Sequence, residues 1–252
     1  MVRNTSEKIN MDYPTNIEPP RKTYDLYKPY SEVLPNHPFT WLIVAPRKSG
    51  KSVLLNNIVG RLLRDHSKKR KRGKDPKPFF DLVIMSSPTA SQDPSIDTKH
   101  VSMLLPKYED SQINGIITMA EKMRMENQNG KYARILWVID DCLGQNKSSG
   151  LSRWSHLESF ALRNRHYGVS LLITSQVLRA LSPGFRENGS AWCIFKLPSD
   201  LELKKMEEEI SGFLRAYDQA VVKGPPYSFV YIKVEGGQIH FFHKFEKLLF
   251  VK

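Results

Sequence analysis

The chain of 252 residues has little cysteine and no long apolar run. Its two cysteines, Cys142 and Cys193, are both flanked by apolar residues. Two isolated thiols do not form a disulfide framework, and they suit a reducing compartment. No run approaches the roughly 18 apolar residues of a membrane span, and residues 1–7 lack the apolar core of a signal peptide. We therefore expect a protein that works inside a cell, or inside a particle assembled there.

Acidic residues are scarce relative to basic ones. The chain has 38 Lys and Arg but only 26 Asp and Glu, which gives a net charge of +12 at pH 7. The positive electrostatic field of such a chain favours polyanionic partners: nucleic acid, nucleotide or an acidic membrane surface. With 40% hydrophobic and 10% aromatic residues, the chain can bury a sizeable core, which excludes an intrinsically disordered protein.

Two regions of the chain differ in composition. Residues 1–38 are polar and proline-rich, so we expect an extended arm that wraps this subunit or a neighbour. Residues 39–252 alternate continuous apolar strands with helices, which predicts an α/β domain with a parallel sheet covered on both faces. We expect strands at 41–44, 79–85, 135–139, 169–174 and 191–197, helices at 52–64, 112–125 and 155–164, a helix capped by Ser199 with Glu202, and a C-terminal β-hairpin over 227–245.

A phosphate-binding motif follows the first strand. Residues 45–52 match the Walker A pattern G-x-x-x-x-G-K-[ST], with Ala45 in place of the first glycine. The residues expected to bind the nucleotide are Pro46, Arg47, Lys48, Ser49, Gly50, Lys51 and Ser52. Gly50 lets the backbone approach a phosphate, Lys51 reaches the β- and γ-phosphates, and the Ser52 hydroxyl ligates Mg²⁺.

An acidic pair follows the strand at 135–139. Asp140 and Asp141 give the Walker B form, in which Asp140 holds Mg²⁺ through water and Asp141 polarises the attacking water. The strand at 169–174 leads into Ser175 and Gln176. Because a polar side chain at the tip of a strand beside the Walker strands can touch the γ-phosphate, Gln176 is the candidate sensor.

A GTPase switch is a competing interpretation of the same region. Residues 141–144 match D-x-x-G, and Asn146-Lys147 is similar to the guanine-reading N-K-x-D. However, Ser149 stands where the final Asp belongs, and the pair lies too close to D-x-x-G to form a separate base pocket. We reject a GTPase on these grounds.

Four segments of the chain carry a further signal: residues 47–52, 85–89 (Met-Ser-Ser-Pro-Thr), 139–142 (Ile-Asp-Asp-Cys) and 165–176, which run from Arg-His to Ser-Gln. Together they resemble the poxvirus-type genome-packaging ATPases of the FtsK–HerA superfamily. The resemblance covers about residues 38–197. It implies a P-loop fold with an additional catalytic strand, and ATP- and Mg²⁺-dependent translocation of double-stranded DNA into a viral capsid. Ala45, and Asp141 where many relatives carry Glu, depart from the pattern.

The resemblance also implies a homo-oligomeric ring, a pentamer or hexamer, with ATP bound between subunits. An arginine of the neighbouring subunit then neutralises charge in the transition state. Arg165 is the favoured candidate because it stands in the Arg-His motif, and Arg186 is the second. The implied partners are DNA and a capsid vertex or portal protein, without a membrane. The implied location is the host cytoplasm or nucleus, or the virion.

A basic run lies between the first helix and the second strand. Lys68, Lys69, Arg70, Lys71 and Arg72 are consecutive cations that repel one another and do not pack. Contact with DNA phosphates, a nuclear localisation signal and a solvated loop are the three open interpretations.

Three rival functions remain open. A cellular relative of the same superfamily would use identical chemistry in DNA repair or transfer. A nucleotide-binding assembly protein would bind nucleic acid without motor activity. A small-molecule kinase is a weaker option, because the sequence has no evident lid or acceptor motif.

Overall fold

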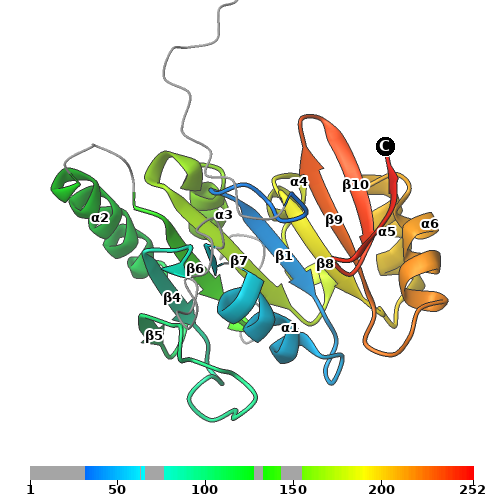
Figure 1. The fold of residues 1–252 in the computed structure, drawn as a ribbon, viewed down its shortest axis with the longest axis horizontal. Coiled ribbons are helices and arrows are strands. Elements are labelled where there is room, and N and C mark those ends of the chain that lie inside the picture. The colour runs from blue at the N-terminus through cyan, green and yellow to red at the C-terminus, as the bar shows by residue number, and fades with distance from the viewer. Residues whose placement is uncertain (1–31, 63, 66–76, 128–132, 143–154) are drawn as a thin grey trace, which may run out of the picture.

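The computed structural model describes residues 32–62, 64–65, 77–127, 133–142 and 155–252. Within these ranges, nine strands form one sheet in the order β11-β10-β9-β8-β1-β7-β6-β4-β5, with helices on both faces (Figure 1). A separate antiparallel pair joins β2 (Arg64–Asp65) to β3 (Lys77–Pro78). The predicted α/β fold class is therefore confirmed.

The parallel part of the sheet holds the motifs. It comprises β8 (Ala191–Phe195), β1 (Thr40–Val44), β7 (Val169–Ser175), β6 (Ile135–Ile139), β4 (Leu82–Ser86) and the edge strand β5 (Met103–Leu105). Every residue of β1, β6, β7 and β8 is buried, which explains their continuous apolar sequences. β7 lies between β1 and β6. The Walker A and Walker B strands are thus separated by an inserted strand, as the additional-strand fold predicts.

The C-terminal strands extend the same sheet with antiparallel pairing. β9 (Phe229–Glu235) pairs with β8, β10 (Gln238–His243) pairs with β9, and β11 (Lys247–Val251) pairs with β10. The predicted hairpin is therefore present, but it is one part of a three-stranded extension. The sequence did not predict β11, and it did not predict β5.

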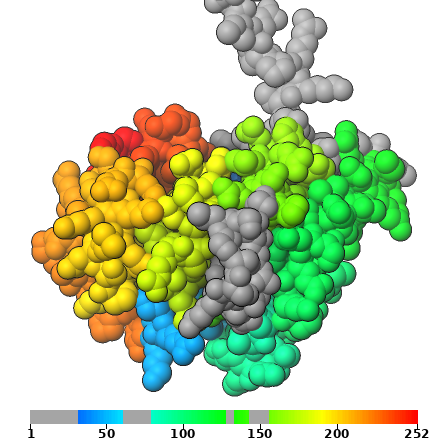
Figure 2. Space-filling view, turned by 180° about the vertical axis from the view of Figure 1, so that it is seen from behind, coloured from blue at the N-terminus to red at the C-terminus, as the bar shows by residue number. Residues whose placement is uncertain are grey.

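Each face of the sheet has its own apolar core. Leu42 and Val44 point to the face covered by α2 (Ser111–Glu126), α3 (Ser155–Ala161), α4 (Pro183–Glu187), α5 (Asp200–Glu209) and α6 (Phe213–Tyr217). Figure 2 shows this face, across which α2, α3 and the C-terminal helices spread. Trp41 and Ile43 point to the opposite face, which is covered by α1 (Lys51–Asn57) and the following π-helix Ile58–Leu62. Because successive side chains of β1 point to opposite faces, this strand contributes to both apolar cores.

Several boundaries differ from the sequence prediction. The first helix, expected over 52–64, is α-helical only to Asn57 and then continues as the π-helix. The Ser199 hydroxyl accepts from the Glu202 N–H at 3.4 Å, as predicted for an N-cap. The Glu202 side chain instead accepts from the Arg179 N–H, so the reciprocal half of the capping box is absent.

The end of the predicted arm packs on the sheet. Leu34 and His37 are buried, and the carbonyl groups of Glu32 and Val33 accept from Lys233 and Tyr231 of β9. His37 Nδ1 lies 2.6 Å from the Ser170 hydroxyl, and burial lowers the pKa of His37 to about 3. Residues 1–31 lie outside the described ranges. None of the helices in the described part of the chain is both long enough and apolar enough to cross a membrane.

Candidate nucleotide site

A cavity of about 1120 Å³ lies at the carboxyl ends of the parallel strands. Because parallel strands end at the same edge of a sheet, the residues after β1, β6 and β7 meet there. Its lining includes every predicted nucleotide-binding residue except Ser49, together with Asp140, Asp141 and Gln176. The structure therefore brings together three motifs that are far apart in the sequence.

Backbone strain is concentrated around this cavity. Among the described residues, the non-glycine residues with positive φ are Lys48, Asp141, Tyr227 and Lys244, and all four line the cavity. A left-handed conformation in such residues costs on the order of 1–3 kcal/mol and persists only where the surroundings impose it. The coincidence makes this cavity the candidate functional site.

The loop before α1 has the geometry of an anion-binding turn. Lys48 and Gly50 adopt positive φ angles of 63° and 95°, and alternation of left- and right-handed residues turns successive N–H groups inward. The Ser49 hydroxyl donates to the Pro46 carbonyl at 2.6 Å, which closes the loop on itself. Ala45 has no positive φ. It is buried and donates its N–H to the Ser175 carbonyl, so it extends β1 and needs no glycine.

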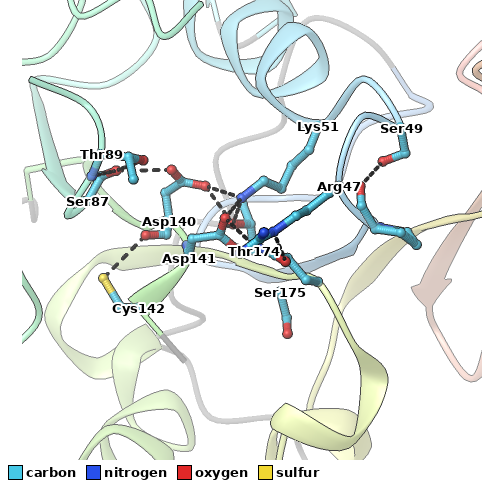
Figure 3. A network of polar contacts seen from close by, with 12 residues as sticks. Arg47, Ser49, Lys51, Ser87, Thr89, Asp140, Asp141, Cys142, Thr174 and Ser175 are labelled. Atoms are coloured by element: carbon cyan, nitrogen blue, oxygen red, sulfur yellow. Dashed lines mark hydrogen bonds and ion pairs between the residues drawn. The ribbon is translucent and has the colours of Figure 1, made fainter. Parts of the chain in front are cut away.

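Lys51 connects the two acidic residues of the site (Figure 3). Its Nζ lies 3.1 Å from Asp140 Oδ1 and 2.5 Å from Asp141 Oδ2. Asp140 is only 2% exposed. A buried carboxylate is costly unless it is paired and hydrogen-bonded, so Lys51 both compensates this charge and stands where phosphate oxygens can compete for it.

Two hydroxyl groups complete the environment of Asp140. Thr174 Oγ1 donates to Asp140 Oδ1 at 2.7 Å, and Ser87 Oγ donates to Asp140 Oδ2 at 3.0 Å. Thr174 also accepts the Asp141 N–H at 3.1 Å, which holds the strained Asp141 backbone in place. Both residues lie in segments that carry the resemblance, 85–89 and 165–176, but the sequence analysis assigned neither of them a role. The signal for Thr174 was a polar residue near the end of a mainly apolar strand.

Gln176 bridges the acid to the phosphate loop. Its Nε2 donates to Asp141 Oδ2 at 2.9 Å, while its Oε1 accepts from Arg47 Nε at 3.2 Å. The amide therefore fixes the orientation of the Asp141 carboxylate. Gln176 thus joins the end of β7 to both Asp141 and the phosphate loop.

The oxygen donors at this edge fit a magnesium ion. Mg²⁺ is usually bound through one or two carboxylates, waters and substrate phosphates rather than by an all-protein cage. Ser52, Asp140 and Asp141 line the cavity together and offer one hydroxyl and two carboxylates. The described residues contain no cluster of three or more acidic, His or Cys ligands, so a metal here depends on the nucleotide for its remaining ligands.

Cys142 follows the two acids and contacts the ends of two strands. Burial raises the pKa of its thiol to about 12. The Sγ lies 3.3 Å from the carbonyl oxygens of both Ser86 and Asp140, to which its single S–H can donate. The thiol therefore links the end of β4 to the end of β6.

The two candidate arginines lie in different environments. Arg165 belongs to the 3₁₀ turn Asn164–Tyr167 before β7 and is exposed. Seven residues of β7 separate this turn from Gln176, roughly 23 Å at 3.3 Å per residue. Arg165 thus lies at the amino ends of the parallel strands, whereas the cavity lies at their carboxyl ends. Its side chain cannot reach phosphates bound in the cavity of its own subunit.

Arg186 is buried inside its own subunit. It is 6% exposed, its Nε and Nη2 contact the Glu209 carboxylate at 2.8–2.9 Å, and its Nη1 donates to the Leu181 carbonyl. A guanidinium held in this way is not free for a neighbouring subunit, which removes the reason for choosing Arg186 as a second finger. The basic residues Lys68, Lys69, Arg70, Lys71 and Arg72 lie outside the described residues.

Solved structures share this fold, although no protein-family model and no curated protein sequence matches the chain. The genome-packaging NTPase B204 from Sulfolobus turreted icosahedral virus 2, in complex with AMP, has a TM-score of 0.57 at 16% identity, covering 82% of this chain and 97% of that one. The same protein with ATP-gammaS gives 0.56 at 17%, with the same coverage. The pCW3 conjugation coupling protein TcpA gives 0.50 at 14%, covering 84% of this chain and 59% of that one. This chain therefore shares its fold with a genome-packaging NTPase and with a conjugation coupling protein.

Proposed function

We propose that this protein is an ATPase that translocates double-stranded DNA and packages a viral genome into a capsid. The observation that carries the proposal is the contact network of Lys51, Asp140, Asp141, Thr174 and Gln176 at the carboxyl ends of adjacent strands. The fold shared with a genome-packaging NTPase that binds nucleotides supports it.

Each residue of the network has a place in hydrolysis. Lys51 exchanges its carboxylate partners for the β- and γ-phosphates, which leaves Asp140 and Asp141 free to act. Asp141 accepts the proton of a water whose oxygen attacks the γ-phosphorus, while the bond to the bridging oxygen of ADP breaks. Gln176 and Thr174 hold Asp141 in line for this transfer. Mg²⁺, when held through Ser52 and Asp140, neutralises the phosphate oxygens.

The position of Arg165 supports action between subunits. It is exposed at the edge opposite the cavity, and no described residue is bonded to its side chain. In a homo-oligomeric ring of five or six subunits, that edge can face the cavity of a neighbour. Arg165 would then stabilise charge on the transferring phosphoryl group.

The proposed partners follow from the motor role. Duplex DNA passes through the ring, and a capsid vertex or portal protein holds the ring in place. The proposed site of action is the host cytoplasm or nucleus, with the motor retained on the virion or released from it. The excess of basic residues suits contact with DNA phosphates.

Steady-state ATPase rates with and without duplex DNA test this proposal. A motor hydrolyses ATP and is stimulated by duplex DNA of any sequence, and Asp141→Asn abolishes both rates. A nucleotide-binding assembly protein binds both ligands without stimulated turnover. Phosphate transfer to a small molecule in place of water would indicate a kinase.

A further inference from the structure

The cavity has two walls of different chemistry on either side of the phosphate loop. The polar wall consists of Asp140, Asp141 and Gln176, at the ends of β6 and β7, and the buried Thr174 holds Asp140 from behind. The aromatic wall consists of Phe195, Tyr227 and Phe229, at the end of β8 and the start of β9. In the sheet order β9-β8-β1-β7-β6, the loop after β1 lies between the two walls.

The aromatic wall faces the phosphate loop at Gly50. A Cβ at this position would lie 3.5 Å from Tyr227 Cδ1 and 4.0 Å from Phe195 Cε1. Phe195 pairs with Phe229 across the strands, and their ring centroids are 5.0 Å apart. The Lys244 N–H donates to the Phe229 carbonyl, which brings the turn after β10 to the same place.

Tyr227 is an unusual residue for an exposed loop. The residue is 69% exposed although it lines the cavity, and its φ is +61°. Lys244, which lines the cavity beside it, has a φ of +53°. Two strained non-glycine residues on one side of the cavity show that the fold fixes the backbone there, beyond what a surface loop requires.

The polar wall sets the direction of a bound nucleotide. If Lys51 binds the γ-phosphate beside Asp140 and Asp141, the nucleoside extends from the loop on the other side, toward β8 and β9. Two strand spacings, roughly 10 Å at 4.8 Å each, separate β1 from β9. A flat aromatic surface at that distance suits a purine, because every base has a π-face.

We propose that the aromatic wall binds the purine base of the nucleotide, with Tyr227 stacking on its ring. This rests on the proposed ATP site and adds a residue that the phosphate motifs do not include. Tyr227 contributes to affinity and takes no part in the proton transfer at the polar wall.

Calorimetric titrations with ATP and with inorganic tripolyphosphate test the proposal. Tyr227→Gly removes the ring and tolerates the positive φ, and Tyr227→Phe keeps the ring. We expect the glycine variant to bind ATP roughly 5- to 150-fold more weakly, with unchanged tripolyphosphate affinity and unchanged thermal unfolding. We expect the phenylalanine variant to retain most of the ATP affinity.

Three distinguishable results would overturn the proposal that Tyr227 binds the base. Unchanged ATP affinity in Tyr227→Gly refutes the base site and leaves the ATPase intact. Equal losses for ATP and tripolyphosphate show that Tyr227 supports the phosphate loop instead. Failure of the wild-type protein to bind either ligand refutes the ATP site itself, and the base site with it.

Discussion

The polar wall and the aromatic wall are built on opposite principles. In the polar wall each side chain holds another: Thr174 and Lys51 hold Asp140, and Gln176 holds Asp141. In the aromatic wall the rings contact one another, and Tyr227 remains largely exposed. A linked polar network loses function when any member is removed, because a buried charge is then left unpaired. An aromatic surface loses only the contact area of the ring removed. The two walls should therefore respond differently to substitution.

The largest effect is expected at the centre of the polar wall. Lys51→Ala should abolish both ATP binding and turnover, because the lysine neutralises the phosphates. Asp141→Asn should leave ATP affinity near wild type and lower kcat by roughly 10²–10⁴-fold, because it removes only the proton acceptor. Calorimetry and steady-state kinetics measure the two parameters separately. Wild-type turnover in Asp141→Asn would show that Asp141 is not the base.

Arg165 should give the next largest effect without belonging to either wall. Arg165→Ala should bind ATP normally and lower kcat on the order of 10³-fold, as for other arginine fingers. Mixed with Asp141→Asn subunits, it should regain activity at interfaces that pair an intact Asp141 with an intact Arg165. Arg163→Ala is the matched control, since Arg163 immediately precedes the same turn and is exposed, but its guanidinium bonds Ser159 of its own subunit. Proven mixed rings as inactive as either variant alone would contradict a role in trans.

Substitution of Arg186 should lower stability, in contrast to substitution of Arg165, which should lower turnover. Arg186→Ala removes the guanidinium that bonds the Glu209 carboxylate and the Leu181 carbonyl. Because Glu209 is exposed to water, the expected loss of stability is that of a hydrogen bond to a charged group, about 1.5–3 kcal/mol. Chemical denaturation should show this loss, whereas Arg165→Ala should unfold like the wild type. Wild-type stability in Arg186→Ala would mean that the pair contributes little to the fold.

A smaller effect is expected at Thr174, which lies behind the polar wall. Thr174→Val keeps the shape of the side chain but removes the donor to Asp140 and the acceptor for the Asp141 N–H. We expect kcat to fall roughly 10- to 100-fold, as for other residues that orient a reactive group. Thr174→Ser keeps the hydroxyl and loses the methyl group, so it should retain most of the wild-type rate. A loss as large as that of Thr174→Val would show that the methyl group, and not the hydroxyl, is what matters. The readout is kcat at saturating ATP.

The smallest effect on catalysis is expected for the basic run outside both walls. Neutralising residues 68–72 should leave ATPase activity without DNA near wild type. If these residues contact phosphate, each lost contact lowers the salt slope of duplex binding by about 0.9, whatever the DNA sequence. A salt titration of DNA affinity on both proteins measures the slope. An unchanged slope would exclude phosphate contact and leave nuclear targeting or a solvated loop.

The sequence predicted the parts of the site that are local in the chain. The Walker residues and the strands before them are contiguous motifs, so their placement follows once parallel strands end at one edge. The role of Thr174 depends instead on register: Ile139 pairs with Ile173, which sets Asp140 beside Thr174. No local pattern carries that information.

Features that depend on long-range contacts or on partial exposure were not predicted from the sequence. Arg186 has the sequence context of a surface arginine, and only the fold brings Glu209 of α5 against it. The aromatic wall joins residues from β8, the loop before β9 and β9 itself, which are adjacent only through antiparallel pairing. The short edge strands β5 and β11 are partly exposed, so their sequences lack the continuous apolar runs that revealed the central strands.

Displacement of a third strand from duplex DNA tests the motor most directly. A protein that moves along duplex DNA strips a pre-bound triplex-forming strand, and release of a labelled strand reports this movement. We predict ATP-dependent release by the wild-type protein and none by Asp141→Asn, although both bind ATP and DNA. A wild-type protein that hydrolyses ATP on duplex DNA yet never releases the third strand would contradict translocation.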